Sequence, residues 1–129
     1  MNAVDTNVVV RLIVGDDPDQ ETAARNLIRR DSVWISKTVV LETIWVLRKF
    51  YRLEAAVIYE RLESLIGLEN VHVEDASSVA TAFELMEHGV DPADAMHLAS
   101  TPAGSRFATF DRDLARRAKR AGVSNVSAL

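Results

Sequence analysis

The sequence predicts an α/β fold in which a parallel sheet carries helices on both of its faces. Short apolar segments alternate with longer amphipathic segments along the chain, as strands alternate with crossover helices. Two segments carry clear helix-start signals, 17–20 (Asp-Pro-Asp-Gln) and 91–94 (Asp-Pro-Ala-Asp). The chain has 129 residues and contains no linker, repeat or low-complexity segment, so we expect a single domain over residues 1–129.

The expected elements follow from apolar periodicity and from turn residues. Strands are expected over residues 1–4, 33–36, 71–73, 106–110 and 125–126. Helices are expected over residues 18–30, 37–51, 54–67, 76–88, 92–101 and 114–121. The apolar segment 8–14 fits either a short helix or a continued strand that ends at Gly15. The helices over 37–51 and 54–67 should form a hairpin, whose excess of apolar residues could also supply a dimer surface.

The composition excludes several classes of function. The chain contains no cysteine, so disulfides and thiolate metal sites are excluded. No apolar run approaches the roughly 20 residues of a membrane span, and the N-terminus does not resemble a signal peptide. We therefore expect a cytoplasmic protein with no membrane partner. The net charge of −4 argues against a general nucleic-acid coat, but a nuclease whose metal ions reverse the charge of an acidic site remains compatible with it.

Asp5 lies between a short apolar strand and the apolar segment 8–14. An isolated carboxylate cannot be buried there, because burying an unpaired charge is costly. Asp5 therefore faces a cleft, a cation or a hydrogen-bond network, or it caps a helix that begins with Thr6 and Asn7. Ligands of parallel α/β sheets bind beyond the carboxyl ends of the strands, which is where Asp5 stands.

Glu42 is a second candidate ligand. Between Val39 and Leu47 only Glu42 and Thr43 are polar, and a helix that is apolar nearly all round is typically buried. We therefore expect Glu42 to point into an enclosed place as a ligand of a metal or a water. The alternative is a structural ion pair with an arginine.

Further acids occur in the second half of the chain. Asp94 is the third residue of the helix that follows Asp91, so it is either a ligand or the acidic half of a capping box. His97 lies one turn further on, and we expect it to pack against a neighbouring helix with its ring hydrogen-bonded. Asp111 and Asp113 follow an apolar strand, as Asp5 does, and a helix N-cap is again the alternative.

These acids share a position relative to the predicted sheet. Asp5, Asp111 and Asp113 follow strands, and Glu42 and Asp94 lie near the starts of helices at the same sheet edge. Carboxylates gathered without a basic partner repel one another unless cations bind. Ligand sets made only of oxygen suit Mg²⁺ or Mn²⁺. Such a site is well suited to phosphodiester hydrolysis, because the metal lowers the pKa of a water and stabilises the leaving oxygen.

In this order, the motifs resemble those of the PIN-domain nucleases, and in particular the VapC-type toxins of toxin–antitoxin pairs. The resemblance rests on segments 4–7 (Val-Asp-Thr-Asn), 94–99 (Asp-Ala-Met-His-Leu-Ala) and 109–113 (Thr-Phe-Asp-Arg-Asp), with Glu42 between the first two. It spans nearly the whole chain. Each motif alone is weak, but the ordered set is specific.

The resemblance implies a PIN-like three-layer α/β/α fold with a short parallel sheet of four or five strands, and a metal-dependent endoribonuclease. Its catalytic acids would be Asp5, Glu42, Asp94 and Asp111. The Mg²⁺ or Mn²⁺ ligands would be Asp5, Asp94 and Asp111, with Asp113 as a further acid, whereas Glu42 would hold a water or a second cation. Asn7 would orient Asp5, and Thr109 would orient Asp111. The implied partners are an RNA substrate, a cognate antitoxin and a second copy of the chain.

Three alternatives remain beside the interpretation of the chain as a toxin. Haloacid-dehalogenase-like phosphatases also carry an Asp after the first strand, but they need a second Asp where this chain has Asn7. The other two are a PIN-fold nuclease that processes RNA without a toxin role, and a module that binds RNA or protein without catalysis. The basic residues near the C-terminus are either a solvated helix face or an RNA contact, and we expect Arg112 and Arg116 to hold phosphates.

Overall fold

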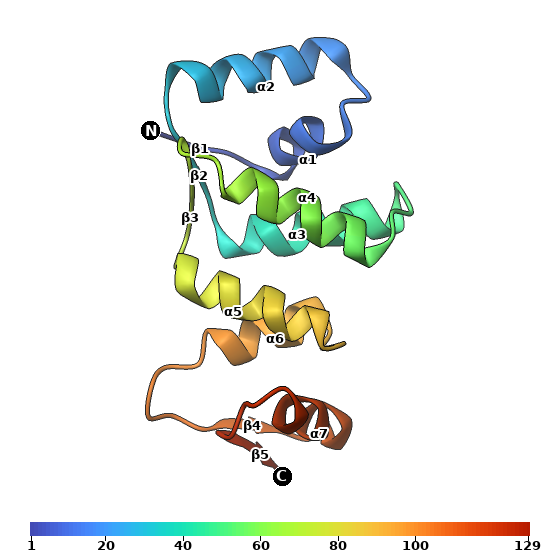
Figure 1. The fold of residues 1–129 in the computed structure, drawn as a ribbon, viewed down its shortest axis with the longest axis vertical. Coiled ribbons are helices and arrows are strands. Elements are labelled where there is room, and N and C mark those ends of the chain that lie inside the picture. The colour runs from blue at the N-terminus through green and yellow to red at the C-terminus, as the bar shows by residue number, and fades with distance from the viewer. The chain divides into compact units, whose positions relative to one another are not determined.

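A computed structural model describes residues 1–129, and the chain divides into two compact units, Met1–Ala76 and Ser77–Leu129. Helices and strands alternate in both units (Figure 1). The first unit contains β1 (Asn2–Ala3), α1 (Thr6–Val14), α2 (Pro18–Arg30), β2 (Val33–Ile35), α3 (Lys37–Lys49), α4 (Ala55–Ile66) and β3 (Val71–Val73). The second unit contains α5 (Ala76–Glu87), which begins at the boundary, α6 (Pro92–Ala99), β4 (Phe107–Thr109), α7 (Arg112–Arg120) and β5 (Val126–Ala128).

All paired strands are parallel, as the alternation of strands and helices predicts. In the first unit the strand order is β1-β2-β3, with Trp34 opposite both Ala3 and His72. In the second unit β4 pairs with β5, and Ala108 lies opposite Ser127. The five strands thus form a three-stranded and a two-stranded parallel sheet.

The core of the first unit lies among its four helices and the sheet. Helix α1 packs against α2 and α3, α3 packs against α4, and α4 packs against β3. The expected hairpin of α3 and α4 is therefore confirmed. The largest fully buried side chains of the first unit are Ile35, Ile44, Leu47, Ile58 and Leu62.

The segment that the sequence left undecided is helix α1. Asp5 caps its start, and Gly15 ends it with a φ of 68°, a left-handed conformation that glycine adopts without strain. Val9 and Val10 are fully buried on the inner face of this helix. The apolar residues are followed by a glycine that caps the C-terminal end, so segment 8–14 fits a helix better than a strand.

Helix α2 begins as predicted, with the Asp17 side chain accepting a hydrogen bond from the amide of Gln20 and Pro18 in the first turn. The Gln20 side chain makes no return bond to Asp17, so the two residues do not form a capping box. It accepts a hydrogen bond from Arg11 Nε on α1 at 2.6 Å. A charged guanidinium is a stronger donor than a backbone amide, so this contact takes the Gln20 oxygen.

In the second unit α7 packs against β4 and β5. It buries Leu114, Ala115 and Ala118, and it ends before Gly122, whose φ is 89°. The remaining positions of α7 are basic or acidic and exposed. No helix in the chain is both long enough and apolar enough to cross a membrane.

Candidate functional site

Asp5 caps helix α1 directly after β1. Its Oδ1 accepts a hydrogen bond from the amide of Val8 at 3.2 Å, which fixes the side chain at the positive end of the helix. The residue is exposed, and Oδ2 has no donor from the protein. The cap therefore positions the carboxylate and leaves one oxygen open to a ligand.

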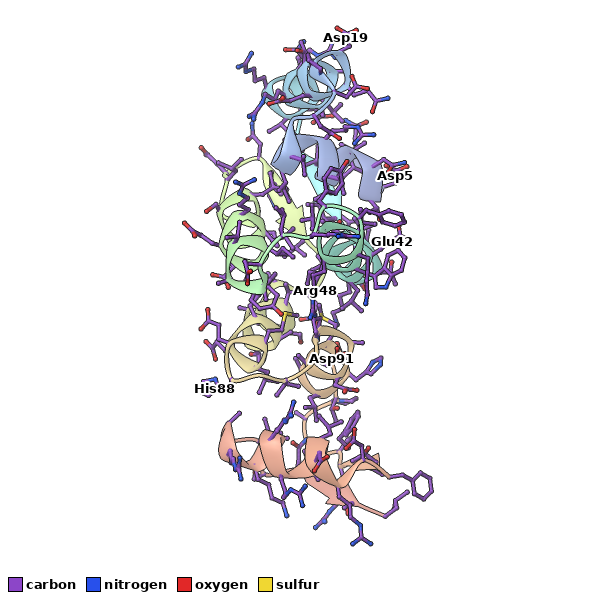
Figure 2. All side chains as sticks on the ribbon, turned by 90° about the vertical axis from the view of Figure 1, so that its right-hand side faces the viewer. Asp5, Asp19, Glu42, Arg48, His88 and Asp91 are labelled. Carbon is purple, nitrogen blue, oxygen red and sulfur yellow. The ribbon has the colours of Figure 1, made fainter.

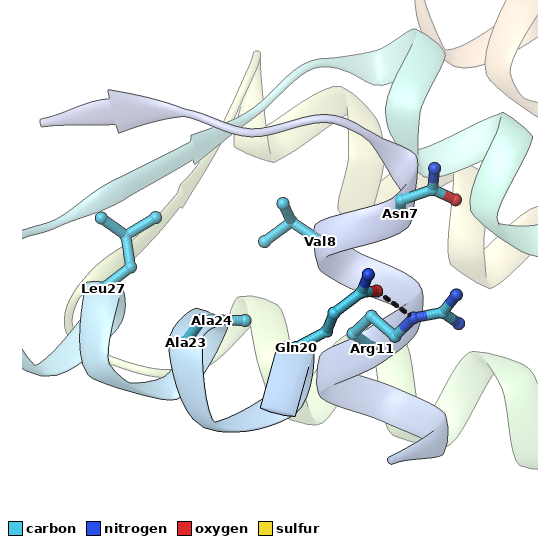
Figure 3. Close-up of a pocket in the computed structure, with 7 residues that line it drawn as sticks. All are labelled: Asn7, Val8, Arg11, Gln20, Ala23, Ala24 and Leu27. Carbon is cyan, nitrogen blue, oxygen red and sulfur yellow. Dashed lines mark hydrogen bonds between the residues drawn. The ribbon is translucent and has the colours of Figure 1, made fainter. Parts of the chain in front are cut away.

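Asn7 makes no hydrogen bond to Asp5 in this structure, where the Val8 amide donates to Asp5 Oδ1. Asn7 lines a mostly apolar pocket of about 370 Å³ between α1 and α2. Val8, Leu27 and Ala24 supply apolar walls, and Arg11 with its partner Gln20 closes one side (Figure 3). None of the predicted acids lines this pocket.

Glu42 is exposed, so the prediction that it points into an enclosed place is wrong. The buried face of α3 is formed by Val40, Thr43, Ile44 and Leu47, and Glu42 lies outside that stripe. Nearly all-round apolarity misled the prediction, because the exposed face of α3 is itself apolar at Trp45. The alternative of an arginine ion pair is not found either, since the Glu42 carboxylate has no hydrogen bond or ion pair.

Asp5 and Glu42 come from helices that pack against each other, α1 and α3. In Figure 2 both side chains project to the same side of the first unit. Neither carboxylate is neutralised by a cation. They are the predicted acids of the first unit.

Asp94 is half-buried in the first turn of α6, whose N-cap is Asp91. Asp91 accepts a hydrogen bond from the amide of Ala93, but Asp94 makes no return bond to Asp91, so the capping-box alternative is not formed. Burial raises the pKa of Asp94 above its ordinary value, and the charges of Asp91 and Asp111 raise it further, whereas His97 lowers it. The carboxylate has no hydrogen-bond donor.

Asp111 caps helix α7 as the sequence suggested it could. Its Oδ1 accepts a hydrogen bond from the amide of Leu114 at 3.0 Å. Thr109 Oγ1 accepts a hydrogen bond from the amide of Asp111 at 3.0 Å, so Thr109 holds the backbone that carries this acid. Oδ2 of Asp111 has no protein donor. Two of the predicted acids, Asp5 and Asp111, are thus both helix caps and open carboxylates.

Asp113 and His97 have different surroundings in the second unit. Asp113 forms an ion pair with Arg116 one turn later on the exposed face of α7, so the structure gives it a partner within its own helix. His97 is exposed and its ring makes no hydrogen bond, so the prediction of a packed histidine is wrong. It acts on the site only through its charge, which lowers the pKa of Asp94.

In the second unit the structure brings Asp91 and Asp111 each within electrostatic reach of Asp94. Neither unit contains a group of at least three His, Asp or Glu side chains arranged to hold a metal ion. The chemistry of the acids nevertheless fits Mg²⁺ or Mn²⁺, because Asp94 offers oxygen ligands, has no basic side chain bonded to it and carries an unfavourable charge. A divalent cation would relieve that charge.

Asp91 is a contributor that the sequence assigned only to helix capping. The signal was present, because it precedes Asp94 by three residues, the spacing at which helical side chains meet. Lys119 is a second contributor, which the sequence did not distinguish from the other basic residues near the C-terminus. With Arg112 and Arg116 it follows an i, i+4, i+7 spacing, and all three side chains line a pocket of about 400 Å³ between α7 and the end of β5.

The comparison with protein families identifies a family for this chain. A family model described as PIN domain matches residues 3–120, a range that includes every predicted acid. No curated protein matches the chain.

Proposed function

Because this match covers nearly its whole length, the chain belongs to the PIN domain family, and we propose that it is a metal-dependent endoribonuclease that acts as the toxin of a toxin–antitoxin pair. PIN domains are typically nucleases that act on RNA and generally use divalent metal ions. The single-domain organisation over residues 1–129 is part of this proposal, since the family match continues through both compact units.

The observation that carries the proposal is the environment of Asp94. A half-buried carboxylate close to further carboxylates, with no hydrogen-bond donor, reduces the stability of the fold when it is ionised. A merely structural acid would be expected to have a donor or a cation beside it. Perturbed titration of this kind is typical of functional sites.

We assign the metal to Asp5, Asp94 and Asp111, with Asp113 as a further acid that must first release Arg116. The metal, Mg²⁺ or Mn²⁺, would supply a water of lowered pKa and would stabilise the leaving oxygen. Glu42 is assigned to position the attacking water. The water would release one proton to solvent as its oxygen bonds to phosphorus, and the oxygen that leaves phosphorus would take up one proton from solvent.

RNA would be held by the basic side of α7. Arg112, Arg116 and Lys119 line one pocket, and guanidinium and ammonium groups bind phosphate oxygens well. The pocket walls formed by Ala115, Ala128 and Leu129 are apolar, which suits the sugar of a nucleotide. We therefore assign the rim of this pocket to contact the sugar-phosphate backbone of the RNA.

The toxin role brings two further partners, a second copy of the chain and a cognate antitoxin, and an RNA target favours the cytoplasm as the place of action. Synthesis of the wild-type protein without an antitoxin should arrest cell growth, and Asp94→Asn should abolish the arrest. Cleavage of RNA in vitro without any effect on growth would instead favour an RNA-processing nuclease. Light scattering of the purified protein tests for the dimer.

The decisive experiment is cleavage of a pool of structured RNAs by the purified protein with Mg²⁺, with Mn²⁺ and with EDTA. We expect discrete fragments that require metal and that disappear with Asp5→Asn and Asp94→Asn. Glu60→Gln, which alters an exposed acid on α4, is the matched control and should cleave as the wild type does. A folded wild-type protein that cleaves nothing in either metal would favour the non-catalytic binding module.

A further inference from the structure

The outer face of α3 carries an exposed aromatic pair that the core of the first unit does not use. The side chains of Trp45 and Phe50 are 53% and 72% exposed, respectively. Their ring centroids lie 5.6 Å apart with an interplanar angle of 74°, an edge-to-face contact. The opposite face of the helix already fills the core through Ile44 and Leu47, which are fully buried. Large apolar rings left in water beside each other indicate a binding surface.

Unpaired cations lie close to this aromatic pair in the sequence. Arg48 and Lys49 are exposed in the last turn of α3, and Arg52 is exposed three residues beyond its end. None of these three side chains forms an ion pair or a hydrogen bond. We call this surface the α3 platform, and it consists of Trp45, Arg48, Lys49, Phe50 and Arg52. Aromatic rings interleaved with free cations match the two parts of a single-stranded nucleic acid, its bases and its phosphates.

The platform continues toward one of the assigned acids. Glu42 precedes Trp45 by three residues, and Lys49 follows Trp45 by four, so these side chains share one exposed stripe of the helix. A base stacked on Trp45 would therefore lie about one helical turn from the Glu42 carboxylate. Phosphates on either side of that base could reach Lys49 or extend past Glu42.

A second copy of the chain fits this surface less well than RNA does. In a two-fold symmetric interface, residues near the axis face their own copies. Arg48, Lys49 and Arg52 would then meet like charges, and Glu42 on the same stripe is one acid against three cations. A polyanion is instead attracted to all three cations.

We propose that the α3 platform binds an unpaired base of single-stranded RNA, with Trp45 and Phe50 stacking on the base and Lys49 and Arg52 holding its phosphates. The inference rests on the proposed nuclease function and assigns it a second RNA contact, on α3, beside the one proposed on α7. In this assignment Trp45 is a positioning residue. It holds a base of the RNA near Glu42 and does not touch the phosphate at which the chain is cut.

The test is binding of a fluorescent single-stranded 12-nucleotide RNA to the full chain in EDTA, measured by anisotropy, so that cleavage does not interfere. Trp45→Ala should weaken binding roughly five- to 150-fold, which is the usual effect of losing one stacked base. Trp45→Leu, which keeps apolar surface without a ring, should weaken it similarly. Trp45→Phe should restore most of the affinity and lose the quenching of tryptophan fluorescence by RNA. Leu68→Ala removes an exposed apolar residue elsewhere in the first unit and is the matched control.

The proposal for the α3 platform is wrong if the wild type does not bind single-stranded RNA. It is also wrong if Trp45→Ala or Trp45→Leu binds this RNA with the same affinity as the wild type. A wild-type dimer that dissociates with Trp45→Ala would assign the surface to a second copy. Metal-dependent cleavage with unchanged Trp45→Ala binding would reject the platform and keep the nuclease. Trp45-dependent binding without cleavage by the wild type would keep the platform and reject the nuclease.

Discussion

At the scale of single residues, Asp94 links the chemistry of the site to the stability of the fold. Its pKa is raised by burial and by the charges of Asp91 and Asp111, with His97 opposing them. The folded state therefore holds this proton more tightly than the unfolded chain, whose ordinary value is 3.8. Ionised Asp94 consequently lowers stability above its raised pKa, and this penalty disappears as the pH falls below 3.8.

We therefore predict that Asp94→Asn stabilises the metal-free protein at pH 7, by a few tenths of a kcal/mol as is usual for a partly exposed site. The gain should shrink through the mildly acidic range and vanish below the ordinary carboxyl pKa. Urea unfolding in EDTA at a series of pH values measures this difference. Glu60→Gln, an exposed acid with no partner, is the control. A gain for Asp94→Asn that did not change with pH would contradict the electrostatic cause.

Residue positions were predictable where a local rule decides them. Asp5, Asp17, Asp91 and Asp111 all cap helices, as short-range spacing indicated. Glu42 was placed wrongly, because an apolar residue on the exposed face, Trp45, cannot be distinguished in the sequence from one in the core.

At the scale of elements, Asp111 has two separable roles, as the cap of α7 and as an assigned metal ligand. Asp111→Asn keeps an oxygen that can accept from the Leu114 amide, so stability should be nearly unchanged while cleavage is lost. Asp111→Ala should also lose the cap, at a cost of about 1 kcal/mol (range about 0.5–2). Asp17→Ala, which removes the cap of α2, should cost about the same and leave cleavage intact. Chemical unfolding and RNA cleavage together distinguish the roles.

Helix α7 also carries the assigned phosphate contacts. Arg116→Glu should weaken RNA binding and reduce the slope of log affinity against log salt by roughly 0.7 or more, the share of one phosphate contact on a single strand. The replacement also breaks the ion pair with Asp113, so Asp113→Asn is made in parallel to isolate that loss. Titrations of RNA at several salt concentrations measure the slope. Binding of Arg116→Glu that equals the wild type at every salt concentration would remove α7 from the interface.

At the scale of the whole molecule, element order was predictable and sheet composition was not. Helix boundaries agree with the sequence to within a few residues, because caps, prolines and glycines mark them locally. The strands are only two or three residues long, and their pairing depends on residues far apart in the chain. No local pattern specifies whether such short strands join one sheet, so the division into β1-β2-β3 and β4-β5 could not be inferred.

The assigned acids come from both compact units, Asp5 and Glu42 from the first and Asp94 and Asp111 from the second. If they act in one catalytic step, their effects on the rate cannot be independent, because removing any member already disables the step. We expect Asp5→Asn and Asp94→Asn each to reduce cleavage by about 10³-fold or more, in the range seen when members of a catalytic set are removed.

The double variant Asp5→Asn/Asp94→Asn should then be no less active than the worse of the two single variants. Single-turnover cleavage of a fixed RNA substrate at saturating Mg²⁺ measures all four proteins, and urea unfolding verifies that each is folded. This comparison needs a substrate that gives enough signal. If the reductions in cleavage rate of the two single variants multiply in the double variant, the acids of the two units contribute separately. In that case the single metal site is wrong, and the acids of the second unit, Asp94 and Asp111, would have to be tested as a site of their own.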